Sequence, residues 1–175
     1  MNIILIGYRG SGKSRVGRRL ASRMGSKFVD TDDLIESKEG KISDIVKSHG
    51  WDRFRAVEKK MIEEISREDN LVIALGGGAV LDTDNVKALR KNGLIIWLKA
   101  DPEVLRKRMR EDHRTPVSRP TLTGKGTIEE LEDVMAYREP FYEKAGKIQL
   151  DTSSLDVEAV VEKITTVLKE TRREK

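Results

Sequence analysis

The sequence contains no cysteine and only two histidines. The absence of cysteine excludes disulfide bonds, thiolate metal sites and thiol catalysis, and the histidines, His49 and His113, lack the spacing of metal ligands. Aromatic residues make up only 5% of the chain, so platforms on which nucleic-acid bases could stack are scarce. No apolar run is long enough to span a bilayer. These absences argue against a disulfide-stabilised, zinc-dependent, nucleic-acid-binding or membrane-spanning protein.

Charged residues, by contrast, are abundant. The 34 lysines and arginines slightly outnumber the 30 acidic residues, which gives a formal net charge of +4. A basic balance can indicate nucleic-acid binding or a small enzyme that handles phosphate and carboxylate anions. Because the basic residues are dispersed among the acids, we favour the enzyme. The length predicts one domain, residues 1–175. Since an apolar segment begins near Met1, we expect no signal peptide and a cytoplasmic location. As a separate expectation, the protein is a monomer that binds neither nucleic acid nor membrane.

Residues 7–14, GYRGSGKS, are the most informative stretch of the chain. They follow the apolar run 3–6 and precede residues 15–24, which have helical character. A strand, a glycine-rich turn, Lys-Ser and a helix in this order form the P-loop pattern GxxxxGK[ST] in its required context. The sequence therefore predicts a nucleotide-binding loop.

The residue types of this loop explain its chemistry. Gly7, Gly10 and Gly12 allow positive φ angles that side chains disfavour. The N–H groups of the loop then point inward and form an anion-binding nest at a helix N-terminus. Lys13 supplies a compact charge for the outer phosphates, and the hydroxyl of Ser14 can bind Mg²⁺. The loop predicts ATP and Mg²⁺ but leaves the phosphate acceptor open.

Apolar segments alternate with helical segments along the chain. Five strands are expected at residues 3–6, 27–29, 71–75, 94–98 and 148–150. Helices are expected at residues 14–24, 43–47, 51–67, 84–91, 101–110, 127–144 and 156–172. This alternation predicts a three-layer α/β/α fold with a five-stranded parallel sheet. Ligands of such sheets bind beyond the carboxyl ends of the strands.

Three carboxylates follow the second expected strand in the segment FVDTDD. Asp30, Asp32 and Asp33 could simply cap a helix, with Thr31 or Asp32 as the N-cap and Asp33 the favoured capping carboxylate. Next to a P-loop, however, carboxylates at this edge can also meet Mg²⁺ and an acceptor hydroxyl. Alternation along an extended chain places Asp30 and Asp32 on one side.

Three consecutive glycines, Gly76, Gly77 and Gly78, follow the third expected strand. They could form a tight turn between a strand and a helix, or they could allow the backbone to approach a bound ligand closely. Both alternatives place the glycines at the edge of the sheet that also carries the P-loop.

Two segments interrupt the alternation of strands and helices. Residues 32–68 are longer than a simple crossover and are expected to carry two or three short helices. Residues 111–126 contain prolines, glycines, hydroxyls and basic residues without a periodic apolar face, which is typical of a surface loop. In a nucleotide-dependent enzyme such a loop is a candidate lid.

Taken together, these features resemble the shikimate kinases, which belong to the P-loop kinases related to nucleoside-monophosphate kinases. The resemblance covers nearly the whole chain and rests on ordered motifs: GYRGSGKS with the following GRRLA, FVDTD at 28–32, FRAVE at 54–58, LGGGAV at 75–80, Arg119-Pro120, and YREPFY at 137–142. It implies ATP-dependent phosphorylation of the 3-hydroxyl of shikimate, with a substrate-binding segment near 32–60 and a lid near 111–126.

The resemblance also implies roles for individual residues. Shikimate would be bound by Asp32, Arg55, Gly76, Gly77, Gly78 and Arg138, and ATP by Gly10, Ser11, Gly12, Lys13, Ser14, Arg15, Arg108 and Arg119. Lys13, Asp32 and Arg119 would be catalytic, with Asp32 accepting the proton of the attacking hydroxyl. Ser14 would bind Mg²⁺ directly, and Asp32 or Asp30 would reach it through water.

Some positions depart from the family pattern. The lid reads RPTL rather than RPLL, Arg15 stands where threonine is usual, and residues 151–155 lack an arginine that often contacts the adenine. These departures concern nucleotide affinity more than reaction type. The alternatives are another small-molecule P-loop kinase, such as a gluconate kinase, and a regulatory module that binds nucleotide without catalysis.

Overall fold

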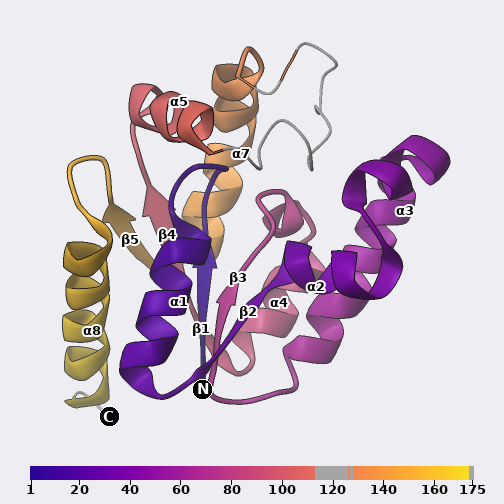
Figure 1. Ribbon diagram of the computed structural model, residues 1–175. Coiled ribbons are helices and arrows are strands. Elements are labelled where there is room, and N and C mark those ends of the chain that lie inside the picture. The colour runs from indigo at the N-terminus through magenta and orange to yellow at the C-terminus, as the bar shows by residue number, and fades with distance from the viewer. Residues whose placement is uncertain (113–125, 127, 174–175) are drawn as a thin grey trace.

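The computed structural model describes residues 1–112, 126 and 128–173. Its centre is a parallel five-stranded sheet with the strand order β2-β3-β1-β4-β5 (Figure 1). The strands are β1 (Asn2–Ile6), β2 (Lys27–Asp30), β3 (Leu71–Ala74), β4 (Gly93–Lys99) and β5 (Ile148–Asp151). The predicted α/β fold with five parallel strands is therefore confirmed, and each strand lies within one or two residues of its predicted range.

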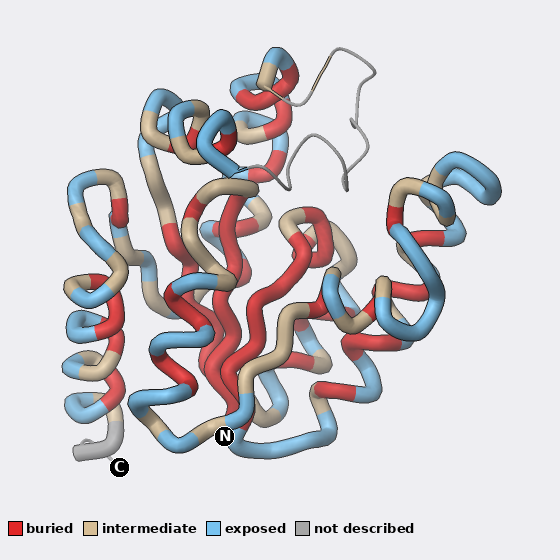
Figure 2. Tube along the Cα trace, viewed as in Figure 1, coloured by how far each residue is buried: buried red, intermediate tan, exposed pale blue. Residues whose placement is uncertain are grey.

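The central strands form the core of the molecule. Every residue of β1 and β3 is buried, whereas the edge strands β2 and β5 are partly exposed (Figure 2). A parallel sheet covered by helices on both faces requires such continuous apolar strands in its centre. Because β1 and β3 are neighbours, the loops that follow them lie side by side at the carboxyl edge of the sheet.

Helices cover both faces of the sheet. α1 (Lys13–Met24) and α8 (Val157–Arg173) pack on one face, where Val16, Leu20 and Val161 meet the side chains of the strands. The other face is covered by the C-terminal part of α3 (Ile42–Ile65), α4 (Thr83–Arg90) and α7 (Leu131–Ala145). In the part of the chain that the structure describes, no helix combines the length and the apolar character needed to cross a membrane.

The long crossover after β2 contains two helices, α2 (Thr31–Glu39) and α3, which pack on each other around Ile35 and Phe54. α3 is kinked at Gly50, whose φ of 78° interrupts the helix between the two helical segments expected there. The expectation of two or three short helices in this region is therefore confirmed. The predicted cap was wrong: α2 begins after Asp30, whose side chain accepts a hydrogen bond from the N–H of Asp32.

Near the carboxyl edge, α5 (Pro102–Glu111) packs against α7 through Leu105, Met109 and Leu131. α7 begins at Leu131, four residues later than its predicted start. A short 3₁₀ helix, η1 (Ala79–Leu81), directly follows the glycine run. The predicted lid, residues 111–126, lies outside the described residues except for its first two positions and Gly126.

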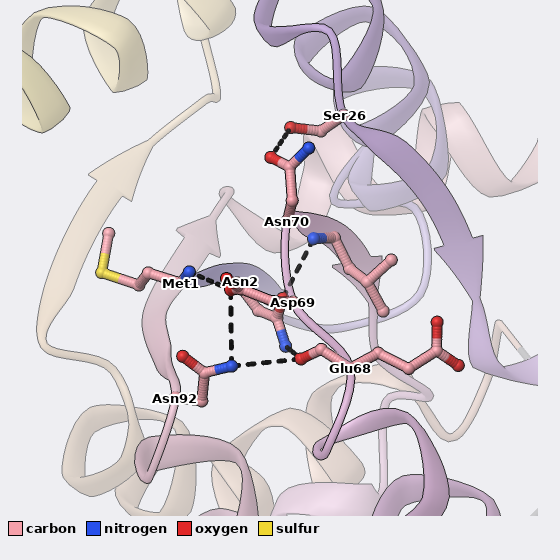
Figure 3. Close-up of polar contacts among 8 residues, drawn as sticks. Met1, Asn2, Ser26, Glu68, Asp69, Asn70 and Asn92 are labelled. Atoms are coloured by element: carbon pink, nitrogen blue, oxygen red, sulfur yellow. Dashed lines mark hydrogen bonds and ion pairs between the residues drawn. The ribbon is translucent and has the colours of Figure 1, made fainter.

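At the opposite edge, asparagine side chains join the amino ends of β1, β3 and β4 (Figure 3). The amide of Asn2 accepts a hydrogen bond from the N–H of Leu71 (2.9 Å) and donates one to the carbonyl of Glu68 (2.9 Å). Asn92 donates to the same carbonyl (3.1 Å), and the Met1 amino group pairs with Asp69. These contacts fix the loop before β3 to the start of β1 and to the residue that precedes β4.

Candidate active site

Two adjoining cavities open at the carboxyl edge of the sheet. The first lies between α3, the turn after β3 and α7, and it is lined by Tyr8, Arg9, Asp32, Ile42, Trp51, Phe54, Arg55, Glu58, Gly76, Gly77, Gly78 and Arg138. The second surrounds the loop before α1 and extends to α5 and to the segment after β5. Arg9, Asp32 and Ile42 line both cavities. A ligand in one cavity would therefore face a ligand in the other.

The second cavity is built around the P-loop. Gly7, Gly10 and Gly12 have φ angles of 143°, 80° and 93°, which confirms the predicted positive φ values. Gly12 is the N-cap of α1, and neither a capping side chain nor an acidic residue in the first turn occupies this helix end. The first N–H groups of a helix have no partners within the helix. This end of α1 is consequently suited to bind an anion.

Lys13 is the first residue of α1 and lines the second cavity. Its ammonium group donates hydrogen bonds to the carbonyls of Gly7 (2.8 Å) and Tyr8 (3.0 Å). The side chain therefore folds over its own loop, at the place where the backbone N–H groups create an anion site. An ammonium in this position adds a full positive charge to the partial charges of the loop.

Ser14 and Asp30 bring a hydroxyl and a carboxylate together beside the P-loop. The Oγ of Ser14 donates a 2.6 Å hydrogen bond to Oδ2 of Asp30, while Oδ1 of Asp30 caps α2. Asp32, the second residue of α2, lines the same cavity. These oxygen donors fit Mg²⁺, which binds through one or two protein groups plus water and substrate phosphates. Among the described residues, no group of three or more carboxylates or histidines forms an all-protein metal site.

In the first cavity, Glu58 is the most deeply buried charged side chain. It is 1% exposed, and its Oε2 accepts a 2.5 Å hydrogen bond from Arg55. Burial raises the pKa of Glu58 to about 7, and the positive charge of Arg55 opposes this rise. Sequence reasoning assigned Glu58 no role. The signal was the spacing within FRAVE, because residues three apart on a helix are neighbours.

Arg55 is held by aromatic rings as well as by Glu58. Its guanidinium carbon lies 5.1 Å from the ring centre of Phe54 and 5.6 Å from that of Trp51. Phe54 is buried in the cluster between α2 and α3. Cation–π contacts and an ion pair together restrict the guanidinium to one place on the cavity wall.

The glycine run makes room for functional side chains. A Cβ atom on Gly76 would lie 2.7 Å from Oδ1 of Asp32 and 2.8 Å from Oε1 of Glu58, and one on Gly78 would collide with the guanidinium of Arg55. None of the three glycines has a positive φ angle. Gly76 and Gly78 are therefore required for the close approach of these side chains, and not for a left-handed turn. A hydrogen bond from the N–H of Gly76 to Oγ1 of Thr31 (2.8 Å) also fixes it to α2.

Arg138 comes from α7 and reaches the same cavity from the opposite side to α3. It is 7% exposed, which is unusual for an arginine. Together with Arg9 and Arg55 it gives the cavity three guanidinium groups, against the carboxyl groups of Asp32 and Glu58. The first cavity consequently suits a small ligand that combines a negative charge with hydroxyl groups.

The remaining predicted residues lie around the second cavity. Arg15 is exposed on α1 and lines it. Arg108 of α5 donates hydrogen bonds to the carbonyl (2.8 Å) and hydroxyl (3.3 Å) of Thr152, so the segment after β5 holds this guanidinium in place. Leu155 of that segment also lines the cavity. Arg119 lies outside the described residues, so its predicted role stays a prediction.

The structure thus brings the predicted residues together as two groups. Ser11, Lys13 and Ser14 surround an anion site, and Arg55, Arg138 and the glycine run surround a small charged cavity. Asp32 lies where the two cavities meet. This arrangement can place a phosphate donor next to a hydroxyl acceptor, with a carboxylate available to take a proton.

Comparison with known proteins points to one family. Residues 9–169 match the family model of shikimate kinase. The shikimate kinase of Symbiobacterium thermophilum is 43% identical over 173 residues, which cover 97% of this chain and 97% of that protein. The shikimate kinase of Caldicellulosiruptor saccharolyticus is 39% identical over 175 residues, 98% of this chain and 99% of the other.

Solved structures agree with these matches. The shikimate kinase from Acinetobacter baumannii in complex with shikimate superimposes with a TM-score of 0.89 and 30% identity, and the match covers 97% of this chain and 93% of that one.

Proposed function

Since the chain belongs to the shikimate kinase family and is thus an ATP-dependent kinase of shikimate, we propose that the two adjoining cavities bind its two substrates. The second cavity binds ATP, with the outer phosphates on the P-loop. The first cavity binds shikimate, with its 3-hydroxyl directed towards the P-loop. The observation that carries this proposal is the position of Asp32, which lines both cavities at their junction.

Shikimate is recognised through its carboxylate and its hydroxyls. Arg55 and Arg138 both line the first cavity, and a guanidinium can bind a carboxylate through two parallel hydrogen bonds. The backbone of Gly76–Gly78 forms part of the wall of this cavity, and the side chains of Asp32 and Arg55 pack directly against it, where they can meet the substrate. Asp32 accepts hydrogen bonds from the ring hydroxyls.

The chemistry is a displacement at the terminal phosphorus of ATP. Asp32 takes the proton of the 3-hydroxyl as its oxygen bonds to phosphorus, and the bond to the oxygen bridging to ADP breaks. Lys13 and the N–H groups of residues 10–14 stabilise the negative charge on the transferred group. Positioning and electrostatic stabilisation supply most of the rate enhancement in reactions of this kind. We assign Arg119 the same role, from its place in the RPTL motif.

The donor set beside the P-loop fits Mg²⁺. Ser14 would bind it directly and Asp30 or Asp32 through water, since all three line the second cavity. When bound, Mg²⁺ supplies positive charge that neutralises the phosphate oxygens. Because Ser14 is the donor in its hydrogen bond to Asp30, the lone pairs of its Oγ would be free to bind the metal while that bond is kept. The hydrogen bond to the carboxylate thus orients the hydroxyl oxygen for the ion.

Turnover across acceptors tests the proposal directly. ADP formation from ATP and Mg²⁺ is measured with shikimate, with gluconate and with nucleoside monophosphates as separate acceptors. We expect turnover with shikimate alone. Turnover restricted to gluconate or to a nucleotide would overturn the assignment, and shikimate binding without ADP formation would favour a non-catalytic nucleotide-binding module.

A further inference from the structure

Tyr142 is a buried polar residue at the wall of the first cavity that no step above uses. It lies on α7 and is 2% exposed. Its hydroxyl donates a 2.5 Å hydrogen bond to the carbonyl of Gly77, a residue 65 positions earlier in the chain. Its ring stacks on Trp97 of β4, with the ring centres 5.7 Å apart and an angle of 27° between the planes. The ring is thus fixed against the sheet while the hydroxyl reaches the glycine run.

The same hydroxyl also contacts Arg138, one helical turn earlier. Burial raises the pKa of Tyr142 to about 12, and the positive charge of Arg138 and a side-chain hydrogen bond from it oppose this rise. A Cβ atom on Gly77 would lie 3.5 Å from Nη1 of Arg138 and 3.6 Å from the hydroxyl of Tyr142. A tyrosine hydroxyl can accept one hydrogen bond while it donates another. Tyr142 therefore links the guanidinium of Arg138 to the backbone of Gly77.

We propose that Tyr142 is the positioning residue that fixes the carboxylate-binding side of the shikimate cavity. The inference rests on the proposed function, because it assigns Arg138 to the substrate carboxylate. A bidentate hydrogen bond to a carboxylate requires a guanidinium with a defined plane and position. The hydroxyl of Tyr142 restrains that plane. At the same time it fixes the peptide of Gly77, whose neighbours Gly76 and Gly78 pack against Asp32 and Arg55.

This role predicts an effect on substrate binding and not on phosphoryl transfer. Tyr142 does not line the ATP cavity, and it lies beyond the cavity wall from Asp32 and Lys13. Its loss should therefore raise the KM for shikimate and leave kcat and the KM for ATP nearly unchanged. A residue that only supported the fold would lower stability without this selective effect.

The test compares Tyr142→Phe with Tyr137→Phe. Phenylalanine retains the ring that stacks on Trp97, so the variant is expected to fold, which thermal unfolding checks. Tyr137 lies on the same helix but is 64% exposed and pairs only with the ring of Phe141 among the described residues, which makes it a matched control. We expect Tyr142→Phe to raise the KM for shikimate roughly tenfold, as for loss of one hydrogen bond to a charged group. The control should stay within twofold of wild type.

A substrate analogue distinguishes positioning of Arg138 from a general loosening of the cavity. In this analogue a hydroxymethyl group replaces the carboxylate of shikimate, so the contribution of Arg138 is absent. The penalty of Tyr142→Phe in kcat/KM should then fall from roughly tenfold to less than threefold. An equal penalty for both substrates, an unchanged KM for shikimate, or a parallel loss of kcat and of ATP binding would each overturn the proposal.

The experiment includes a substitute variant and a wild-type control. If Tyr142→Phe does not fold, Tyr142→Leu, which also lacks the hydroxyl, is measured with the same two substrates and should show the same selective rise in the KM for shikimate. Wild type must turn over shikimate in the same assay; if it does not, the proposed function fails, which is distinct from a failure of the role of Tyr142. If wild type turns over shikimate and the kinetic constants of Tyr142→Phe equal those of wild type, only the positioning role is refuted.

Discussion

The two edges of the sheet use buried polar groups in opposite ways. At the amino edge, both the oxygen and the nitrogen of the Asn2 side chain have hydrogen-bond partners (Figure 3). At the carboxyl edge, Oε1 of Glu58 and Oγ of Ser11 are buried without a hydrogen-bond partner among the described residues. A buried polar atom without a partner reduces stability. The amino edge therefore stabilises the fold, whereas the carboxyl edge retains polar groups that ligands can satisfy.

The same contrast appears in how charge is distributed. The first cavity gathers three arginines and two carboxylic acids within one small space, while the amino edge relies on neutral amides and a single exposed ion pair. Charged groups that are buried together lose their hydration, which costs free energy, whereas an ion pair on the surface stays hydrated. We expect substitutions at the carboxyl edge to change activity much more than stability, and substitutions at the amino edge to do the reverse.

The largest effect should come from Lys13→Ala. Removal of the ammonium leaves the P-loop N–H groups in place but withdraws the charge that offsets the transferred phosphoryl group. We expect kcat to fall roughly 10³-fold, with a melting temperature within a few degrees of wild type. Lys91→Ala, an exposed lysine just before β4, serves as the control and should alter neither quantity. Retained wild-type turnover in Lys13→Ala would contradict the P-loop mechanism.

Arg138→Ala should have the next largest effect. It should change the binding of shikimate in the first cavity but not the binding of ATP in the second. Loss of one of the two carboxylate partners should raise the KM for shikimate roughly 100-fold, while the KM for ATP changes less than threefold. Arg53→Ala, an exposed position two residues before Arg55 on α3, is the matched control. Steady-state kinetics, with shikimate and ATP varied in turn, measures the two KM values. Equal losses for shikimate and ATP would contradict the assignment of Arg138 to the first cavity.

At the amino edge, Asn2→Ala should lower stability and leave activity nearly unchanged. The substitution leaves the buried N–H of Leu71 without its partner, which should lower the free energy of unfolding by about 2 kcal/mol. Both KM values should stay within twofold, because Asn2 lies at the far end of β1 from the P-loop. Unfolding in urea measures the free energy of unfolding of both proteins. Asn92→Ala is the milder control, since the carbonyl of Glu68 then keeps its hydrogen bond from Asn2.

Much of this contrast could be predicted from the sequence. Apolar bursts located all five strands, and the rule that ligands bind beyond the carboxyl ends of parallel strands placed the P-loop, Asp32 and the glycine run at one edge. Periodicity specifies elements and faces, but it does not specify which side chain reaches which distant backbone group. The bonds of Thr31 to Gly76 and of Tyr142 to Gly77 span 45 and 65 residues, so only the packed structure reveals them.

One local interpretation was wrong for a physical reason, and a second was incomplete. The favoured cap of α2 was Asp33, but Asp30 caps it, since the helix begins one residue after the strand ends; Asp33 instead pairs with Arg18 on the surface. The glycine run was expected to form a tight turn or to approach a ligand, and it does form a tight turn, closed by the hydrogen bond from the N–H of Ala79 to the carbonyl of Gly76 (3.1 Å). Beyond this expectation, Gly76 and Gly78 leave space for the side chains of Asp32, Glu58 and Arg55. Those side chains come from other elements, so their demand for space is not visible in the local sequence.

Glu58 gives the smallest effect and the sharpest test of the carboxyl edge, because its contribution to stability depends on pH. Burial raises its pKa in the folded protein from an ordinary value of 4.5 to about 7. The folded state therefore binds this proton more tightly than the unfolded state between these two values. The stabilisation from Glu58 is complete below pH 4.5 and is lost as the pH rises through 7.

The variant Glu58→Gln isolates this contribution. Glutamine keeps the size of the side chain but cannot ionise, so every other titration cancels when the two proteins are compared. From pH 6 to pH 8, the free energy of unfolding of wild type should fall by about 1 kcal/mol relative to that of Glu58→Gln. Urea unfolding of both proteins at each pH measures the difference. A constant or growing advantage of wild type with rising pH would show that Arg55 outweighs burial and holds Glu58 ionised. The carboxyl edge would then resemble the amino edge, with its buried polar groups satisfied before any ligand binds.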